Sequence, residues 1–435
     1  DTGPHVGLLW ALELLAWHDN HLYRVFDALL RLAEGDPGGS LANRPFASAA
    51  AMVDPVLPQS STSVEERVAL LAAAADARPD IGWKLLSDNF GTFGSMRMLT
   101  QSHTPSYRNW NVRTDEDRPT NSDIVAQLDR VLALMLGLAR SDGSKWRDLL
   151  DSIRFLPLDW VRRILNRLER EASVDPELAV SVWPILRREL HFLRRTPPGD
   201  EVEKAEQLVA KYYEELAPAG VVERCAWMFD HAANVPERIT GDIDVRADND
   251  WLQTNRRLAV EEVWADPNRE SLLGRLAQAA PHKGLLAVTL AETTIADEVE
   301  QLLRERRENL KELVPSFVAR RSADQGSAWL REVLEPIVEE GDTELVVNTL
   351  LCVPPSTEVW DVVNALGRDV SEPYWDAVHV RVLPEDAGWD RAIDALIRAG
   401  RLGAMVESAS YAGEHISPAT AIQVLETVRK RYVET

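Results

Sequence analysis

Cysteine is nearly absent from this chain, which has two in 435 residues, Cys225 and Cys352. They lie far apart in the sequence, and neither belongs to a Cys-x-x-Cys pair or a His/Cys cluster. This usage excludes a disulfide framework and a structural zinc finger, and it is typical of a reducing compartment. We therefore expect a cytoplasmic protein.

Long apolar runs are missing as well. No stretch approaches the roughly 20 apolar residues that a membrane-spanning helix needs, so we expect no membrane partner. The chain starts at Asp1 without an initiator Met, a basic segment or an apolar leader, and its end at residues 429–432 falls inside a helical pattern. These ends lead us to expect a piece of a larger protein.

Positive charge is in short supply. There are 48 Lys and Arg against 70 Asp and Glu, which gives a formal net charge of −22. Such an excess disfavours binding to phosphate backbones and to anionic membranes. It is compatible with a basic partner, or it serves solubility alone.

Catalytic and cofactor motifs are missing too. The sequence has no GxxxxGK[ST], GxGxxG, HExxH or GxSxG pattern, and residues 143–145 (Gly-Ser-Lys) lack the upstream glycine of a phosphate-binding loop. His18 and His21 have a spacing that suits zinc, but Asp19 or Asn20 between them suits the N-cap of a helix. We therefore predict no enzyme, no metal site and no cofactor.

What the sequence has in abundance is helical periodicity. Apolar residues recur three and four positions apart through most of the chain, as at Leu22, Val25, Phe26 and Leu29. Capping signals precede many of these stripes: Asp175-Pro176, Asp266-Pro267, Ser417-Pro418 and the capping box of Ser63 with Glu66. A proline after Trp183 predicts a kink or break in one helix.

Strand signals are sparse. The best one, at residues 378–382, has no pairing partner and is expected to be helix or an irregular edge. The fold class predicted is all-α, an α-solenoid of degenerate helix pairs (HEAT-, armadillo- or TPR-like) that can fall into two segments, with pairs recurring about every 30–40 residues after residue 260. The expected segments are N-terminal pairs at 1–87, an irregular polar insertion at 88–121, a middle helical segment at 122–235, a linker at 236–260 and C-terminal repeats at 261–435.

Four segments carry a resemblance to a known class of protein. They are residues 8–17 (LLWALELLAW), 41–46 (LANRPF), 57–60 (LPQS) and 78–83 (RPDIGW). Together they resemble the helical regions of large multidomain bacterial conflict and antiphage-defence proteins. The resemblance implies a sensor or autoinhibitory scaffold whose chemistry lies elsewhere, and it transfers no residue roles.

The insertion at 88–121 is one candidate binding site. It combines arginine and aromatic side chains, which dominate binding hot spots and also stack on single-stranded nucleic acid. Its candidate binding residues are Arg97, His103, Tyr107, Arg108, Trp110 and Arg113. The alternatives are a surface loop anchored on the scaffold, or a cryptic enzyme that uses His103.

A second candidate is locally basic. Between residues 154 and 195, nine arginines meet six acidic residues, in a chain that is acidic overall. The members of this arginine patch are Arg162, Arg163, Arg167, Arg187, Arg188, Arg194 and Arg195. They could hold nucleic acid on one face of a HEAT-like solenoid, or they could pair with acidic residues of the same chain.

The sequence as a whole therefore predicts a non-catalytic scaffold or sensor region that binds a protein or peptide. A nucleic-acid-binding solenoid and a cryptic enzyme remain as alternatives. The inference from solenoid to binding is an analogy with other repeat proteins, because their stacked helices offer long exposed surfaces.

Overall fold

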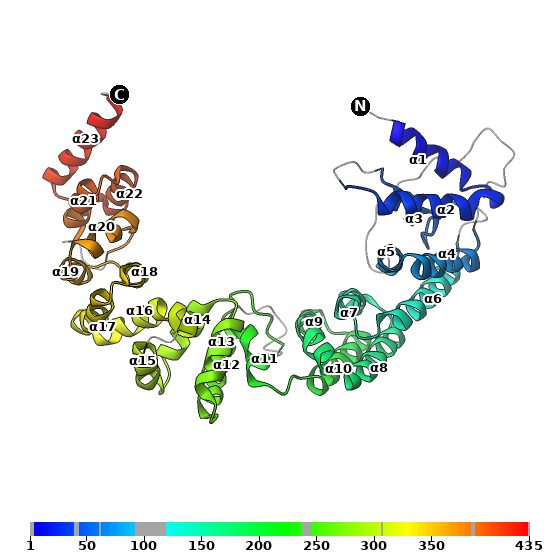
Figure 1. The fold of residues 1–435 in the computed structure, drawn as a ribbon, viewed down its shortest axis with the longest axis horizontal. Coiled ribbons are helices and arrows are strands. Elements are labelled where there is room, and N and C mark those ends of the chain that lie inside the picture. The colour runs from blue at the N-terminus through cyan, green and yellow to red at the C-terminus, as the bar shows by residue number, and fades with distance from the viewer. Residues whose placement is uncertain are drawn as a thin grey trace. The chain divides into compact units, whose positions relative to one another are not determined.

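The computed structural model describes residues 4–38, 43–60, 62–91, 119–236, 245–305, 308–383 and 388–433. These residues form α-helices and short 3₁₀ helices joined by turns, and no strand occurs among them (Figure 1). The predicted all-α class is confirmed. Within the same residues, no helix combines the length and apolar character that crossing a membrane requires.

The chain forms two compact units. Unit 1 comprises Asp1–Pro218 and Asn234–Asp244, and unit 2 comprises Ala219–Ala233 and Val245–Thr435. The chain therefore passes from one unit to the other three times, because residues 219–233 pack with unit 2 before the chain returns to unit 1. Each unit has a hydrophobic core of its own.

The linker predicted at 236–260 is wrong over most of its length. Helix α12 spans Val245–Ala265 and buries Leu252, Ala259, Val260 and Val263. Residues 237–244 of the predicted linker lie outside the described residues. Along α12 the buried apolar residues lie at helical spacing, while polar residues such as Gln253 and Arg257 are exposed.

The described residues of unit 1 form ten α-helices and one short 3₁₀ helix. They are α1 (Pro4–Leu15), α2 (Asp19–Glu34), α3 (Pro45–Met52), α4 (Val64–Ala77), α5 (Pro79–Phe90), α6 (Asn121–Ala139), α7 (Gly143–Leu150), η2 (Ile153–Phe155), α8 (Leu158–Val174), α9 (Pro176–Arg195) and α10 (Asp200–Glu215). Each helix packs on near neighbours in the sequence, as α4 on α5 and α9 on α10.

Local signals fix most of the helix starts in unit 1. Ser63 Oγ accepts from the Glu66 amide while the Glu66 carboxylate accepts from the Ser63 amide, so the predicted capping box begins α4. Asp175 caps α9 as predicted. Helix α2 is capped by His18 Nδ1, 3.3 Å from the Asn20 amide nitrogen, and not by Asp19 or Asn20. Helix α9 continues through Pro184 without a break.

A buried polar network holds α4, α5 and α6 together. Gln127 accepts from Arg67 Nε at 2.6 Å and donates to the Val53 carbonyl at 2.8 Å and to Asn89 Oδ1 at 3.2 Å. Asn89 donates to the same carbonyl at 2.7 Å, and Arg67 also donates to the Thr62 carbonyl. These buried groups find hydrogen-bond partners in one another, which offsets the cost of removing them from water.

Unit 2 is a longer series of short helices. They are α11 (Val221–Cys225), η3 (Ala226–Phe229), α12, α13 (Arg269–Ala279), α14 (Lys283–Ala291), α15 (Ala296–Arg304), η4 (Glu308–Leu313), α16 (Val314–Gln325), α17 (Ser327–Glu339), α18 (Thr343–Cys352), α19 (Thr357–Ala365), α20 (Arg368–Ala377), α21 (Trp389–Arg398), α22 (Leu402–Ala412), η6 (Gly413–His415) and α23 (Pro418–Val433).

Alternate helices of unit 2 stack on each other. Helices α12, α14, α16, α18 and α20 form one row, in which each contacts the next, and α17 contacts α19 in a second row. Contacts between consecutive helices, such as α16 with α17, join the rows. This is the arrangement of an α-solenoid. The row helices α12, α14, α16, α18 and α20 begin at residues 245, 283, 314, 343 and 368. The first two intervals, 38 and 31 residues, lie within the predicted 30–40, and the last two, 29 and 25, are shorter.

Ion pairs also link elements about 30 residues apart. Lys283 of α14 pairs with Glu312 of η4, Lys311 of η4 with Asp342 before α18, and Arg391 of α21 with Asp361 of α19. One detail differs from the predictions: Asp266-Pro267 lies in the turn before α13, which begins at Arg269. Residues 378–382 have no regular structure, which agrees with the irregular alternative predicted for them.

Candidate functional site

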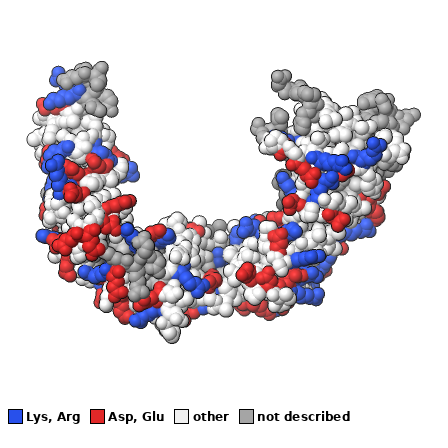
Figure 2. Space-filling model, viewed as in Figure 1, with Lys and Arg blue, Asp and Glu red and all other residues white. Residues whose placement is uncertain are grey.

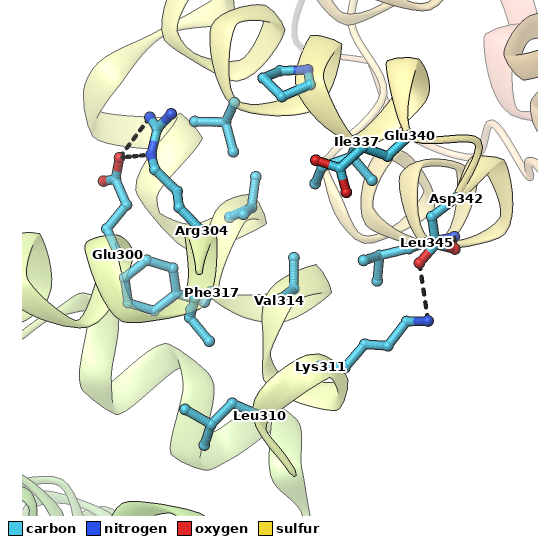
Figure 3. Close-up of a pocket in the computed structure, with 14 residues that line it drawn as sticks. Glu300, Arg304, Leu310, Lys311, Val314, Phe317, Ile337, Glu340, Asp342 and Leu345 are labelled. Atoms are coloured by element: carbon cyan, nitrogen blue, oxygen red, sulfur yellow. Dashed lines mark hydrogen bonds and ion pairs between the residues drawn. The ribbon is translucent and has the colours of Figure 1, made fainter. Parts of the chain in front are cut away.

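A cavity of about 240 Å³ opens among α15, η4, α16, α17 and α18 of unit 2 (Figure 3). We call it the α15–α18 pocket. Most of its lining is apolar, and the apolar side chains belong to the hydrophobic core, with 9% or less of each residue exposed. They are Leu303, Leu310, Val314, Phe317, Val318, Val333, Ile337 and Leu345.

Helical spacing places these side chains on the pocket. Val314, Phe317 and Val318 are three and four positions apart on α16, and Val333 and Ile337 are four apart on α17. Residues at these spacings share one face of a helix. In Figure 3, Val314, Phe317 and Leu310 lie on the floor of the pocket, with Ile337 on the opposite wall.

Two short elements form one side of the pocket. Helix α15 ends at Arg304, and the 3₁₀ helix η4 begins at Glu308. Side chains from both short elements line the pocket, with α17 across from them.

Charged side chains form the rim. Arg304 donates to Glu300 Oε1 from Nε at 3.1 Å and from Nη2 at 2.8 Å. On the other side, Lys311 Nζ lies 2.9 Å from Asp342 Oδ2. Glu340 lies close to Asp342 (Figure 3). The arrangement of an apolar interior under charges of both signs suits the binding of an amphipathic group.

The size of the pocket indicates what it can hold. An apolar cavity of about 150 Å³ accommodates benzene, whereas pockets for drug-sized ligands start at about 300 Å³. A volume of about 240 Å³ therefore matches one large apolar side chain. Among the described lining residues there is no Ser, Thr, Cys, His or Tyr, so the lining offers no hydroxyl, thiol or imidazole for catalysis.

The site predicted in the 88–121 insertion lies outside the described residues. Arg97, His103, Tyr107, Arg108, Trp110 and Arg113 all fall in the undescribed stretch 92–118. On either side of that stretch, α5 continues to Phe90 and α6 begins after the Thr120 cap.

The predicted arginine patch is largely paired within unit 1. Arg188 NH2 lies 2.5 Å from Asp151 and 3.0 Å from the buried Glu189. The other ion pairs are Arg162 with Asp159, Arg163 with Asp129, Arg167 with Glu171 and Arg194 with Glu206. Arg195 donates to the carbonyls of His191 and Val235.

Arg187, the remaining member of the patch, is buried. Its guanidinium carbon lies 5.4 Å from the centroid of the Trp183 ring, and burial lowers the pKa of Arg187 to about 10. The patch thus consists of one buried arginine and six that already hold acidic groups or carbonyls. This pairing reduces the attraction that the patch could exert on phosphates.

No metal centre emerges either. In the part of the chain that the structure describes, no three His, Cys, Asp or Glu side chains converge in a way that could hold a metal ion. His18 and His21 contact each other through their rings, whose centroids are 5.0 Å apart.

Sequence reasoning missed the α15–α18 pocket. Its lining comes from five elements, and the apolar members are indistinguishable in sequence from ordinary core residues. Two signals were available: the charged stretch after Leu303 that ends α15, and Pro336 inside α17, which removes a backbone hydrogen bond.

Comparison with known proteins gives little further information about the fold. No protein-family model matches the chain, and no curated protein matches it. One solved structure that aligns with it is a "circular tandem repeat protein with novel repeat topology and enhanced subunit contact surfaces", at 13% identity and a TM-score of 0.27, over 98% of each chain. The solenoid assignment therefore rests on the stacking of the helices in this chain.

Proposed function

We propose that this chain is a non-catalytic helical-repeat scaffold that binds a protein partner by receiving one large apolar side chain in the α15–α18 pocket. The observation that carries the proposal is the pocket itself, with a floor of core side chains and charges of both signs at its mouth. Binding interfaces commonly concentrate their energy in one buried anchor surrounded by polar contacts.

A displayed library of random peptides tests this proposal. The library is selected on the wild-type chain and on Val314→Phe, which places a ring in the pocket. Val174→Phe is the matched control, because Val174 is 83% exposed at the end of α8 in unit 1. We expect sequences with a large apolar residue to be enriched on wild type and on Val174→Phe, and lost on Val314→Phe.

Two results would contradict the proposal: no enrichment on the wild-type chain, or equal enrichment on Val314→Phe. Circular dichroism and thermal melting establish that the filled variant folds. If it does not, Val333→Phe fills the same pocket from α17 and takes its place.

We also propose a setting for this activity, in the cytoplasm and within a larger bacterial defence protein. The two cysteines are free thiols, which supports a reducing compartment, and the resemblance of residues 8–17 and 78–83 supports the defence role. In bacteria protected by the whole protein, Val314→Phe is expected to reduce resistance to phage while Val174→Phe preserves it. Full resistance to phage with Val314→Phe would show that the defence role does not depend on the pocket.

A further inference from the structure

The C-terminal half of α17 and the turn into α18 form a continuous acidic segment. From residue 332 to residue 344 the chain carries six carboxylates and no Lys or Arg. They are Glu332, Glu335, Glu339, Glu340, Asp342 and Glu344, which we call the acidic rim. Three of them already hold cations of unit 2: Glu332 pairs with Arg304 at 3.9 Å, Glu335 with Arg331 at 2.5 Å and Asp342 with Lys311 at 2.9 Å. The variant described below changes Glu339 and Glu340, at the end of α17. Figure 2 shows acidic side chains gathered over the region where Figure 1 places α17.

Part of the acidic rim sits where negative charge is unfavourable. Glu339 is the last residue of α17 and Glu340 is its C-cap, and the last turn contains no basic residue. The helix dipole disfavours carboxylates at this end. Asp342 differs, because its side chain accepts from the Leu345 amide and caps α18.

The acidic rim borders the α15–α18 pocket directly. Glu340 and Asp342 are lining residues, and in Figure 3 they lie across the pocket from Glu300 and Arg304. An apolar side chain that enters the pocket would therefore bring its neighbours in the partner's sequence against these carboxylates. Complementary charge at such a rim accelerates association and selects among partners.

We infer that the occupant of the α15–α18 pocket is a large apolar side chain carried by a basic peptide segment, whose Lys and Arg residues contact the acidic rim. This inference rests on the proposed function and specifies the partner's chemistry. The net charge of −22 acts in the same direction, since it attracts basic segments over a longer range.

Three labelled peptide libraries of equal length test the inference by fluorescence anisotropy with the full chain. Each has a central Leu, Met, Phe or Trp, and the flanking positions draw on Lys, Arg and Ser, on Ser, Asn and Gln, or on Asp, Glu and Ser. We expect the basic library to bind about tenfold more tightly than the neutral one, and its affinity to fall between about 50 and about 300 mM salt.

The variant that isolates the rim is Glu339→Gln/Glu340→Gln, which leaves the Asp342 cap intact. Its matched control is Glu214→Gln/Glu215→Gln, because these exposed glutamates also end a helix, α10, that has no basic residue in its last turn. The rim variant is expected to weaken the basic library about tenfold, and the control variant to leave its affinity unchanged.

The outcomes separate the two proposals. If all three libraries bind equally and Val314→Phe abolishes binding, the pocket function stands and the charge inference is wrong. Preference for the acidic library also overturns the charge inference. If no library binds, the pocket function fails. Binding of the basic library that survives Val314→Phe would mean general attraction to an acidic chain and overturn both proposals. Binding that falls equally in the two glutamine variants would overturn the charge inference alone.

Discussion

The buried polar side chains of unit 1 join α4, α5 and α6 through hydrogen bonds. Gln127 is fully buried, and its amide joins Arg67 of α4, Asn89 of α5 and the Val53 carbonyl after α3. Each of these partners is itself buried. Removing Gln127 takes away the acceptor of Arg67 Nε at a site away from water, which costs more than the hydrogen bond contributes.

Gln127→Leu is therefore expected to destabilise unit 1 by about 2–3 kcal/mol, because Arg67 Nε loses its acceptor. Hydrogen exchange of peptides from α4, α5 and α6 measures the change. Gln207→Leu, at an exposed position of α10, is the control and should change stability by less than about 0.5 kcal/mol. Equal protection in both variants would show that the network contributes nothing.

The two cysteines should differ sharply in reactivity. Burial raises the pKa of the Cys225 thiol to about 12, and Cys352 is exposed although partial burial raises its pKa as well. Because the thiolate is the reactive form, we expect iodoacetamide to label Cys352 slowly, and faster as the pH rises toward and beyond 9.0. Mass spectrometry should find Cys225 labelled only after unfolding. Labelling of Cys225 in the native protein would contradict its burial.

At the level of elements, the helical periodicity and the helix caps could be predicted from the sequence, because both depend on residues close together in the chain. The capping box of α4 and the Asp175 cap of α9 depend on residues within one turn. The linker predicted at 236–260 is wrong over α12 because the exposed polar and charged residues of this helix outnumber its buried apolar residues. The pocket could not be predicted from the sequence, because α15, η4 and α17 come together only when the helices stack in the folded chain.

Ion pairs that bridge successive helices are a further feature of the elements in unit 2. Glu292, the C-cap of α14, accepts from Arg257 of α12 at 3.2 Å and from Arg320 of α16 at 2.9 Å. Burial raises the pKa of Glu292, but the hydrogen bonds and charges of Arg320 and Arg257 outweigh it, so its pKa lies below 4.5. Its stabilising effect is therefore present above 4.5 and is lost as the pH falls through the lower, folded-state pKa.

Glu292→Gln should accordingly cost about 1 kcal/mol near neutral pH, since both arginines are partly exposed. The difference from wild type should shrink as the pH falls below 4.5, where the wild-type carboxylate also becomes protonated. Urea unfolding at several pH values measures it, with the exposed Glu261→Gln of α12 as control. A cost that is independent of pH would mean that packing, and not charge, is responsible.

At the scale of the whole molecule, the division of the chain into units does not follow a single cut. Residues 219–233 belong to unit 2 although residues 234–244 return to unit 1. In unit 2, Phe229 is fully buried and its carbonyl accepts from the His282 amide at 2.9 Å, while Arg256 Nε donates to the Met228 carbonyl at 2.6 Å. Helix α11 and η3 thus cover the first turns of the solenoid core.

We therefore expect the fragment 219–435 to fold with a cooperative thermal transition, and the fragment 245–435, which lacks α11 and η3, to melt at a lower temperature. The shorter fragment lacks Val222, Cys225 and Phe229, which pack with α12 and α13. The apolar side chains of these two helices therefore become exposed to water. Phe229→Ala in the longer fragment should by itself cost about 3–5 kcal/mol, because a fully buried ring is lost. Circular dichroism melting compares the three proteins. Equal melting temperatures for the two fragments would place the start of unit 2 at Val245 and reduce residues 219–233 to a connection between units.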